Sequence, residues 1–87
     1  MSKTDALPYG IIDSPGTLGQ YVRVRRNQQG ATQAEFASLC GVGIRFISDL
    51  ENGKSTIELG KTLQVLKCLG LEVTINPRGW SDSERSK

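Results

Sequence analysis

The chain has 87 residues, a formal net charge of +2, 37% hydrophobic residues and 23% charged residues. This length suits one small domain with a modest core, and the composition excludes a disordered chain. The chain has no histidine and two widely separated cysteines, Cys40 and Cys68, so we expect no metal site and no cofactor. We interpret both thiols as small core residues of a cytoplasmic protein. We also expect no membrane span and no secretory signal, because no apolar stretch approaches roughly 20 residues.

Residues 1–13 show no periodicity and are expected to form an N-terminal arm. The pair Ser14-Pro15 predicts the start of a helix, because serine can cap the helix and proline fits its first position. Apolar residues at helical spacing follow, and Gly30 is expected to end this helix after about Gln29.

The second half of this predicted helix is basic. Between Tyr21 and Gly30 there are three arginines and no acidic residue. Such a face can meet a phosphate backbone, or it can simply be solvated, and charge alone does not separate these alternatives. The arginines are Arg23, Arg25 and Arg26.

Two short helices are predicted between Thr32 and Gly53. Thr32 and Glu35 have the spacing of a capping box, and Gly41 breaks the first helix where a turn tolerates positive φ. The second helix is expected to start near Gly43. Their spacing predicts a helix-turn-helix, whose second helix enters the major groove of DNA. The residues expected to bind this second helix to the core are Val42, Ile47 and Leu50.

A fourth helix is predicted to open at Ser55-Thr56 with Glu58 and to end at Gly70. Gly60 weakens it by roughly 1 kcal/mol relative to alanine, so we expect a packing reason for that glycine. The residues expected on its inner side are Leu59, Leu63, Leu66, Cys68 and Leu69.

Residues 71–76 alternate apolar and polar side chains, with Leu71, Val73 and Ile75 on one side, and predict a β-strand. A lone strand needs a partner for its backbone groups. Ile11-Ile12 is a weak candidate within the chain, and the same strand of a second copy is the more economical one. Residues 77–87 are expected to form a flexible tail, in which Trp80 either has no fixed contact or anchors a partner protein.

The predicted fold class is therefore all-α: a four-helix bundle-like helix-turn-helix domain at residues 14–70, with a C-terminal β-strand that pairs across a homodimer.

The run TQAEFASLCGVGIRFISDLENGK, together with LGQYVRVRRNQQGATQ before it, resembles the Xre/Cro family of phage and bacterial repressors. The resemblance covers residues 17–70. It implies phosphate contacts at one set of positions, base contacts at another, and a structural salt bridge. The implied phosphate contacts are Thr32, Gln33, Asn52, Gly53 and Lys54; the base-facing positions are Gly43, Ile44, Arg45, Ser48 and Asp49; the salt bridge joins Arg26 and Glu51.

Among the base-facing positions, Arg45 is the strongest candidate, because guanidinium can pair bidentately with guanine. Asp49 lies four residues later on the same face, where it can accept from cytosine or orient Arg45. Alternatively, the two residues form an exposed ion pair with no role in DNA binding. Phe46 is bulky for its position and is interpreted as a partly packed residue rather than a base wedge.

Within this family the chain is most similar to HipB-type antitoxins. The shared features are the Ser-Pro helix start, a single helix after the motif, and the terminal strand. The resemblance implies a dimeric repressor that binds an inverted-repeat operator in double-stranded DNA, represses its own operon and binds a HipA-like serine/threonine kinase toxin. Two alternatives remain: a free-standing repressor without a toxin, and a motif used only for protein contact. An enzyme is not expected, because the sequence offers no nucleophile–base pair and no phosphate loop.

Overall fold

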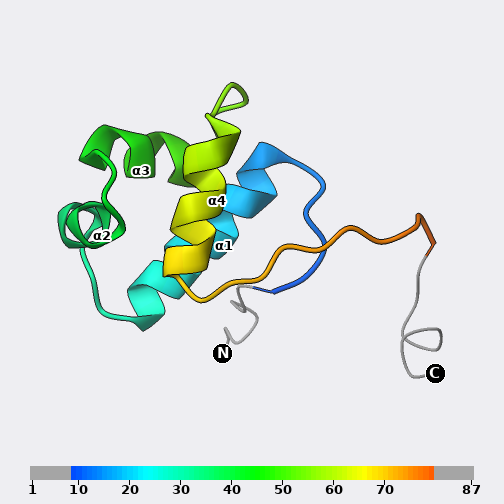
Figure 1. Cartoon of the computed structure of the whole chain (residues 1–87), viewed down its shortest axis with the longest axis horizontal. Coiled ribbons are helices and arrows are strands. Elements are labelled where there is room, and N and C mark those ends of the chain that lie inside the picture. Colours follow the sequence, from blue (N-terminus) through cyan, green and yellow to red (C-terminus); the bar gives the residue numbers. More distant parts are fainter. Residues whose placement is uncertain (1–8, 80–87) are drawn as a thin grey trace.

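The computed structural model of the chain describes residues 9–79, which form four helices (Figure 1). Helix α1 spans Pro15–Gln28, α2 spans Gln33–Cys40, α3 spans Ile44–Glu51 and α4 spans Leu59–Cys68. The predicted all-α architecture is thereby confirmed. The predictions for residues 1–8 of the arm and for residues 80–87, including Trp80, lie outside the described residues. Across residues 9–79, no helix is both long enough and apolar enough to cross a membrane.

Short-range signals set the starts of α1 and α2. The Ser14 hydroxyl accepts a hydrogen bond from the backbone N–H of Thr17 at 3.1 Å, and Pro15 occupies the first turn. At α2, the Thr32 N–H donates to Glu35 Oε1 at 2.9 Å while the Glu35 N–H donates to Thr32 Oγ1 at 3.1 Å. Both predicted caps are confirmed, and each satisfies backbone donors that the helix itself leaves free.

The turn between α2 and α3 depends on Gly41. Its φ of 75° places it in the left-handed region, which costs glycine little and other residues more. The Gly41 N–H donates to the carbonyl of Ser38, and the Val42 N–H donates to that of Ala37. These bonds close α2 and direct the chain into α3, as the helix-turn-helix prediction requires.

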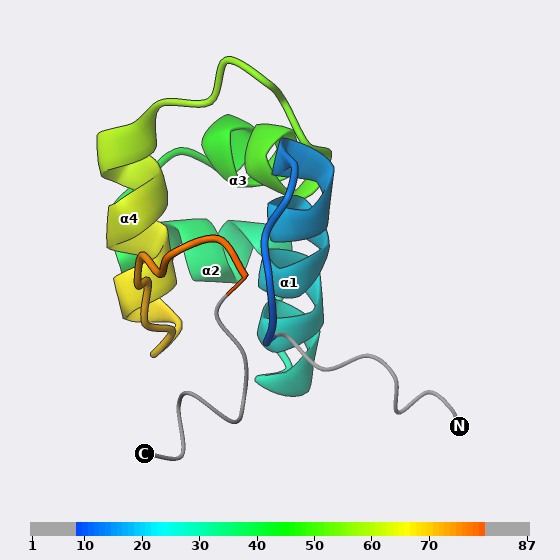
Figure 2. The same ribbon diagram turned by 90° about the vertical axis from the view of Figure 1, so that its right-hand side faces the viewer.

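Helix α3 packs against α1 and α2, and α4 packs against α2. In Figure 2, α1 and α4 stand on opposite sides, with α2 and α3 behind them. Every helix contributes apolar side chains to one shared core, which fixes α3 in place from its inner face. The largest fully buried apolar side chains are Val22, Phe36, Ile47, Leu50, Val65 and Leu69.

One close backbone contact sets the distance between α1 and α3. Gly19 is buried in α1, and a Cβ atom added there would lie 2.7 Å from the carbonyl oxygen of Glu51. Only glycine lets the backbone of α1 approach the end of α3 so closely. The sequence pattern by itself gives no sign of this role for Gly19.

The start of α4 differs from the prediction. The helix begins at Leu59, and Ser55-Thr56 lie in a preceding turn. Glu58 caps it directly, because its carboxylate accepts from the backbone N–H groups of Gly60 at 3.1 Å and Lys61 at 2.6 Å. A Cβ atom on Gly60 would lie 3.0 Å from the Glu58 carboxylate, so this cap, and not core packing, favours glycine there.

The inner face of α4 was also predicted in part wrongly. Leu66 and Leu69 are buried, but Leu59 and Leu63 are 66% and 44% exposed. Cys68 is exposed as well, whereas Cys40 is buried. The helix instead buries Val65 and Thr62, whose hydroxyl donates to the Glu58 carbonyl at 2.7 Å and therefore enters the core with its polar group satisfied.

The predicted strand at residues 71–76 is not present in the described part of a single chain. The Leu71 N–H donates to the Leu66 carbonyl at 2.9 Å, and residues 72–79 make no backbone–backbone hydrogen bond with other described residues. Ile11-Ile12 therefore does not supply a pairing strand. Leu71 packs against the core, whereas Val73 and Ile75 are 51% and 96% exposed. Without a second copy, this segment has no ladder to join.

Candidate nucleic-acid interface

Helix α3 has one buried face and one accessible face. The side chains of its own residues Ile47 and Leu50 are buried in the core, so the opposite face of the helix points outward. Gly43, the N-cap, has no side-chain hydrogen bond to offer, so the first N–H groups of α3 remain open. None of the five predicted base-facing residues is buried: Gly43, Ile44 and Arg45 are exposed, and Ser48 and Asp49 are half-buried.

The charged residues on this face pair differently from the alternatives considered above. The Asp49 carboxylate lies 3.5 Å from the Lys54 ammonium, and it forms no ion pair with Arg45 in the described structure. Asp49 therefore neither neutralises nor orients Arg45 in the free protein. Arg45 is exposed on the outer face of α3.

Phe46 is half-buried and packs against the hydrophobic core. The Lys61 ammonium lies 5.9 Å from the centre of its ring, at the outer limit of a cation–π contact. The interpretation of Phe46 as a partly packed residue is confirmed.

The predicted phosphate contacts lie at two helix ends. Thr32 and Gln33 open α2, and Asn52, Gly53 and Lys54 follow α3. A helix N-terminus presents free N–H groups and the positive end of the helix dipole, both of which favour an anion. The Thr32 hydroxyl is engaged in the capping box, so at Thr32 the side chain shapes the helix start.

A buried carboxylate ties these two helix ends together. The Glu51 side chain is fully buried and accepts from Arg26 Nε at 2.6 Å, Arg26 Nη2 at 2.9 Å and Gln33 Nε2 at 3.0 Å. Arg23 Nε lies 3.5 Å away at the edge of the cluster. Glu51 therefore links α1, the end of α3 and the start of α2 through one charged group.

The charges in this cluster stabilise one another. Burial by itself would raise the pKa of Glu51, but the hydrogen bonds from Arg26 and Gln33, together with the Arg26 charge, lower that pKa below its ordinary value. The hydrogen bond to Glu51 raises the pKa of Arg26 in turn. At neutral pH the pair is thus fully ionised, and Gln33 is held in one orientation.

The arginines of α1 do not form an open basic face. Arg26 is 11% exposed and also donates to the Ala31 carbonyl at 2.7 Å. Arg25 donates to the Leu69 carbonyl at 3.0 Å and to the Tyr9 hydroxyl at 3.3 Å. These two side chains hold the fold together and are not directed to a phosphate backbone.

Arg23 is different, because its side chain is 50% exposed. Its Nη2 lies 3.4 Å from the side-chain oxygen of Asn52, one of the predicted phosphate contacts. The sequence predicted a salt bridge to Glu51 for Arg26, which the structure contains, but it did not separate Arg23 from Arg25. Only the packing of α1 against the end of α3 distinguishes it.

Across residues 9–79, no group of three or more cysteine, aspartate or glutamate side chains is placed to hold a metal ion. What the described surface offers is an exposed helix face, flanked by backbone N–H groups and cationic or amide side chains. That combination defines a helix-turn-helix DNA-binding protein.

Comparison with known proteins assigns the family. Residues 17–74 match the helix-turn-helix domain family. The chain is 48% identical over 64 residues to the uncharacterised HTH-type transcriptional regulator y4mF of Sinorhizobium fredii, covering 74% of this chain and 84% of that protein. It is 31% identical over 71 residues to the antitoxin HipB of Escherichia coli, covering 82% of this chain and 76% of HipB.

Solved structures with a similar fold and at least 30% sequence identity include complexes of HipB. A complex of HipB with the O4 20mer superposes with a TM-score of 0.72 at 30% identity, covering 80% of this chain and 99% of the other. A complex of HipA, HipB, O2 and O3 matches with the same score, identity and coverage. The chain therefore belongs to the helix-turn-helix family of DNA-binding transcriptional regulators, and within it lies close to the HipB-type antitoxins.

Proposed function

We propose that this protein is a homodimeric repressor that binds an inverted-repeat operator, represses its own operon and acts as the antitoxin of a HipA-like serine/threonine kinase. The observation that carries the DNA-binding part is the exposed Arg45 on α3, unpaired with Asp49, beside two helix ends joined by Glu51. The Arg45 guanidinium would read guanine in the major groove, and Gln33 and Lys54 would hold phosphates on the two flanks.

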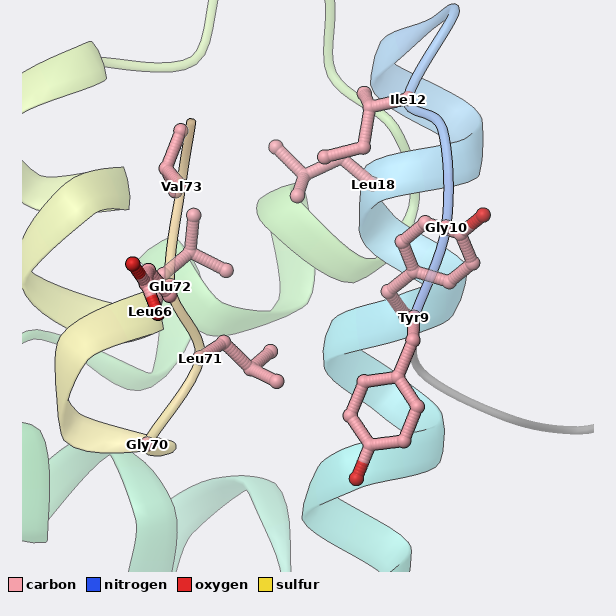
Figure 3. A pocket seen from close by; sticks show the side chains of 10 residues that line it. Tyr9, Gly10, Ile12, Leu18, Leu66, Gly70, Leu71, Glu72 and Val73 are labelled. Atoms are coloured by element: carbon pink, nitrogen blue, oxygen red, sulfur yellow. The ribbon is translucent and has the colours of Figure 1, made fainter. Parts of the chain in front are cut away.

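The dimer is proposed from the segment that one chain leaves unpaired. A pocket of about 330 Å³ lies beside this segment. Figure 3 shows Tyr9 and Ile12 on one side of it and Leu71 and Val73 on the other. A second, wider groove lies between residues 10–12 and residues 72–79. Apolar side chains and unpaired backbone groups border both the pocket and the groove. The strand at residues 71–76 of a second copy would bury these apolar side chains and supply hydrogen bonds to these backbone groups.

Two-fold symmetry then sets the operator geometry. Two copies of α3 would enter successive major grooves about 34 Å apart, so half-sites would be centred roughly ten base pairs apart. Occupancy would block polymerase sterically. The assignment of a kinase partner is supported by the similarity to HipB, one of whose solved complexes includes HipA. Size-exclusion chromatography with a HipA-like kinase tests this partner: co-elution supports the antitoxin role, and a repressor that elutes alone contradicts it.

Fluorescence anisotropy tests the DNA-binding proposal. The protein is titrated onto labelled DNA from upstream of its own gene and onto a scrambled duplex at ~150 mM salt, where non-specific contacts are weakened. We expect a gap of ~1000-fold or more in affinity. Equal, weak binding to both duplexes would favour a motif used for protein contact and would contradict the proposal.

Variants of Arg45 then test its role. Arg45→Ala should lose roughly 1–3 kcal/mol on the operator and relax preference at one base pair. Arg45→Lys keeps the charge but loses the bidentate fork, so it should retain non-specific binding and lose discrimination. Lys67→Ala removes an exposed positive charge from α4 and serves as the control. If Arg45→Ala loses no more affinity than Lys67→Ala and keeps the same base preference, Arg45 is not a base reader.

A further inference from the structure

The two cysteines are far apart in the sequence, but the fold brings them together. Cys40 is the last residue of α2 and Cys68 is the last residue of α4. Gln64, one turn before Cys68, donates to the Cys40 carbonyl at 2.7 Å. Residues four apart share a helix face, so Cys68 is directed to the same end of α2 as Gln64. Cys40 and Cys68 therefore lie at the same end of the contact between α2 and α4.

The two thiols differ in accessibility. Cys40 is 6% exposed, whereas Cys68 is exposed. Burial raises the pKa of Cys40 to about 12, with a smaller contribution from the neighbouring Cys68 thiol. Cys40 is therefore shielded and protonated at neutral pH, and a reagent in solution meets Cys68 first.

We propose that Cys40 and Cys68 form a redox-responsive pair, which closes an intramolecular disulfide when the protein meets a hydroperoxide. The Cys68 thiolate attacks the peroxide oxygen, the O–O bond breaks, and Cys68 becomes a sulfenic acid while the peroxide is reduced to an alcohol or water. The Cys40 sulfur then attacks the sulfenic sulfur, and its proton leaves with the departing hydroxide as water. In total, two thiols and one hydroperoxide yield one disulfide, one water and one alcohol or second water.

The bond would enclose a functionally important stretch of chain. It joins the ends of two helices that already pack together, and the closed loop, residues 41–67, contains all of α3. Closing a loop of this length restricts the unfolded chain, so the oxidised protein resists unfolding more strongly than the reduced one. This effect does not depend on the proposed DNA or kinase partner.

The test uses the full-length reduced protein and tert-butyl hydroperoxide. After treatment we expect both thiols to be lost, the intact monomer to lose two hydrogen atoms in mass, and a reducing agent to reverse the change. The thermal midpoint should rise by about 10 °C or more. An oxidised product that consists only of disulfides between chains, or of sulfinic acid at Cys68, would overturn the proposal.

Two single variants separate the steps. Cys68→Ser changes an exposed side chain and should leave the Cys40 thiol unreactive and the thermal midpoint insensitive to the peroxide. Cys40→Ala keeps a small apolar group in the core and should stop the reaction at the Cys68 sulfenic acid, which dimedone traps. If the unaltered protein accumulates as much dimedone adduct as Cys40→Ala, Cys40 does not resolve the sulfenic acid and the pair is not a redox unit.

Discussion

Replacing Glu51 with glutamine tests whether the buried carboxylate holds the DNA-binding elements together. Glu51→Gln keeps the size of the side chain but removes its charge, which leaves Arg26 without its ionic partner. Removing one member of a buried ion pair costs about 3–5 kcal/mol. Arg26 is 11% exposed and keeps its bond to the Ala31 carbonyl, so we expect a loss near the low end, about 3 kcal/mol.

Urea denaturation followed by far-UV circular dichroism at pH 7 measures this loss directly. For a domain of this size, 3 kcal/mol corresponds to a fall in thermal midpoint of roughly 10–20 °C. Asp49→Asn is the matched control, because it removes the same charge from the same helix. Its pair with Lys54 lies at the surface, where Lys54 is exposed and Asp49 half-buried, so the loss should stay below about 1 kcal/mol.

The pH dependence gives a second, independent readout. Folding lowers the pKa of Glu51 from its ordinary value of 4.5, so the ionised carboxylate stabilises the folded state. That contribution is fully present above pH 4.5 and is lost as the pH falls through the lowered folded pKa. The difference in stability between the unaltered protein and Glu51→Gln should therefore shrink on acidification. A difference below about 1 kcal/mol at pH 7, or one that persists undiminished in acid, would refute this account of Glu51.

Three further outcomes are expected. Gly19→Ala should lower the free energy of unfolding in urea denaturation by about 1–3 kcal/mol, because the new Cβ would lie 2.7 Å from a backbone oxygen of α3. Gly16→Ala is the control: its new Cβ would have its nearest contact 3.7 Å away, so this variant should be neutral or stabilising in the same assay. Gln33→Ala should weaken binding to operator and scrambled DNA about equally in anisotropy titrations; a selective loss on the operator would argue for base contact instead. Val73→Pro should convert the dimer to monomer in sedimentation analysis, and a variant that still sediments as a dimer would exclude strand pairing through residues 71–76.

The helices and their order were predictable because the signals involved are local. Ser14 and the pair Thr32 and Glu35 act within three residues of the chain, and Gly41 satisfies a turn by its own backbone freedom. Such interactions form wherever the sequence occurs, whatever packs around it. The positions facing DNA were proposed by resemblance, and packing of Ile47 and Leu50 leaves those positions unburied.

Contacts between distant parts of the chain decide which individual charged and apolar side chains are buried and which stay exposed. Arg23 and Arg25 look equivalent in sequence, yet only Arg23 remains half exposed. Arg25 donates to the Leu69 carbonyl 44 residues away, whereas Arg23 reaches Glu51 and Asn52 only at the edge of their cluster. Likewise, the apolar pattern of α4 did not show that Leu63 would be exposed while Thr62 was buried.

Local propensity thus accounts for where helices begin and end, because caps and turns involve neighbours in the chain. The way in which four helices share one core decides which face of each helix is buried and which arginine stays most exposed. It also brings Cys40 and Cys68 to the same end of the contact between α2 and α4. The segment at residues 71–76 shows the same contrast between a local sequence pattern and the distant contacts that it needs, here contacts with a second chain. Its alternation favours a strand, but a strand forms only when a second backbone supplies the missing hydrogen bonds.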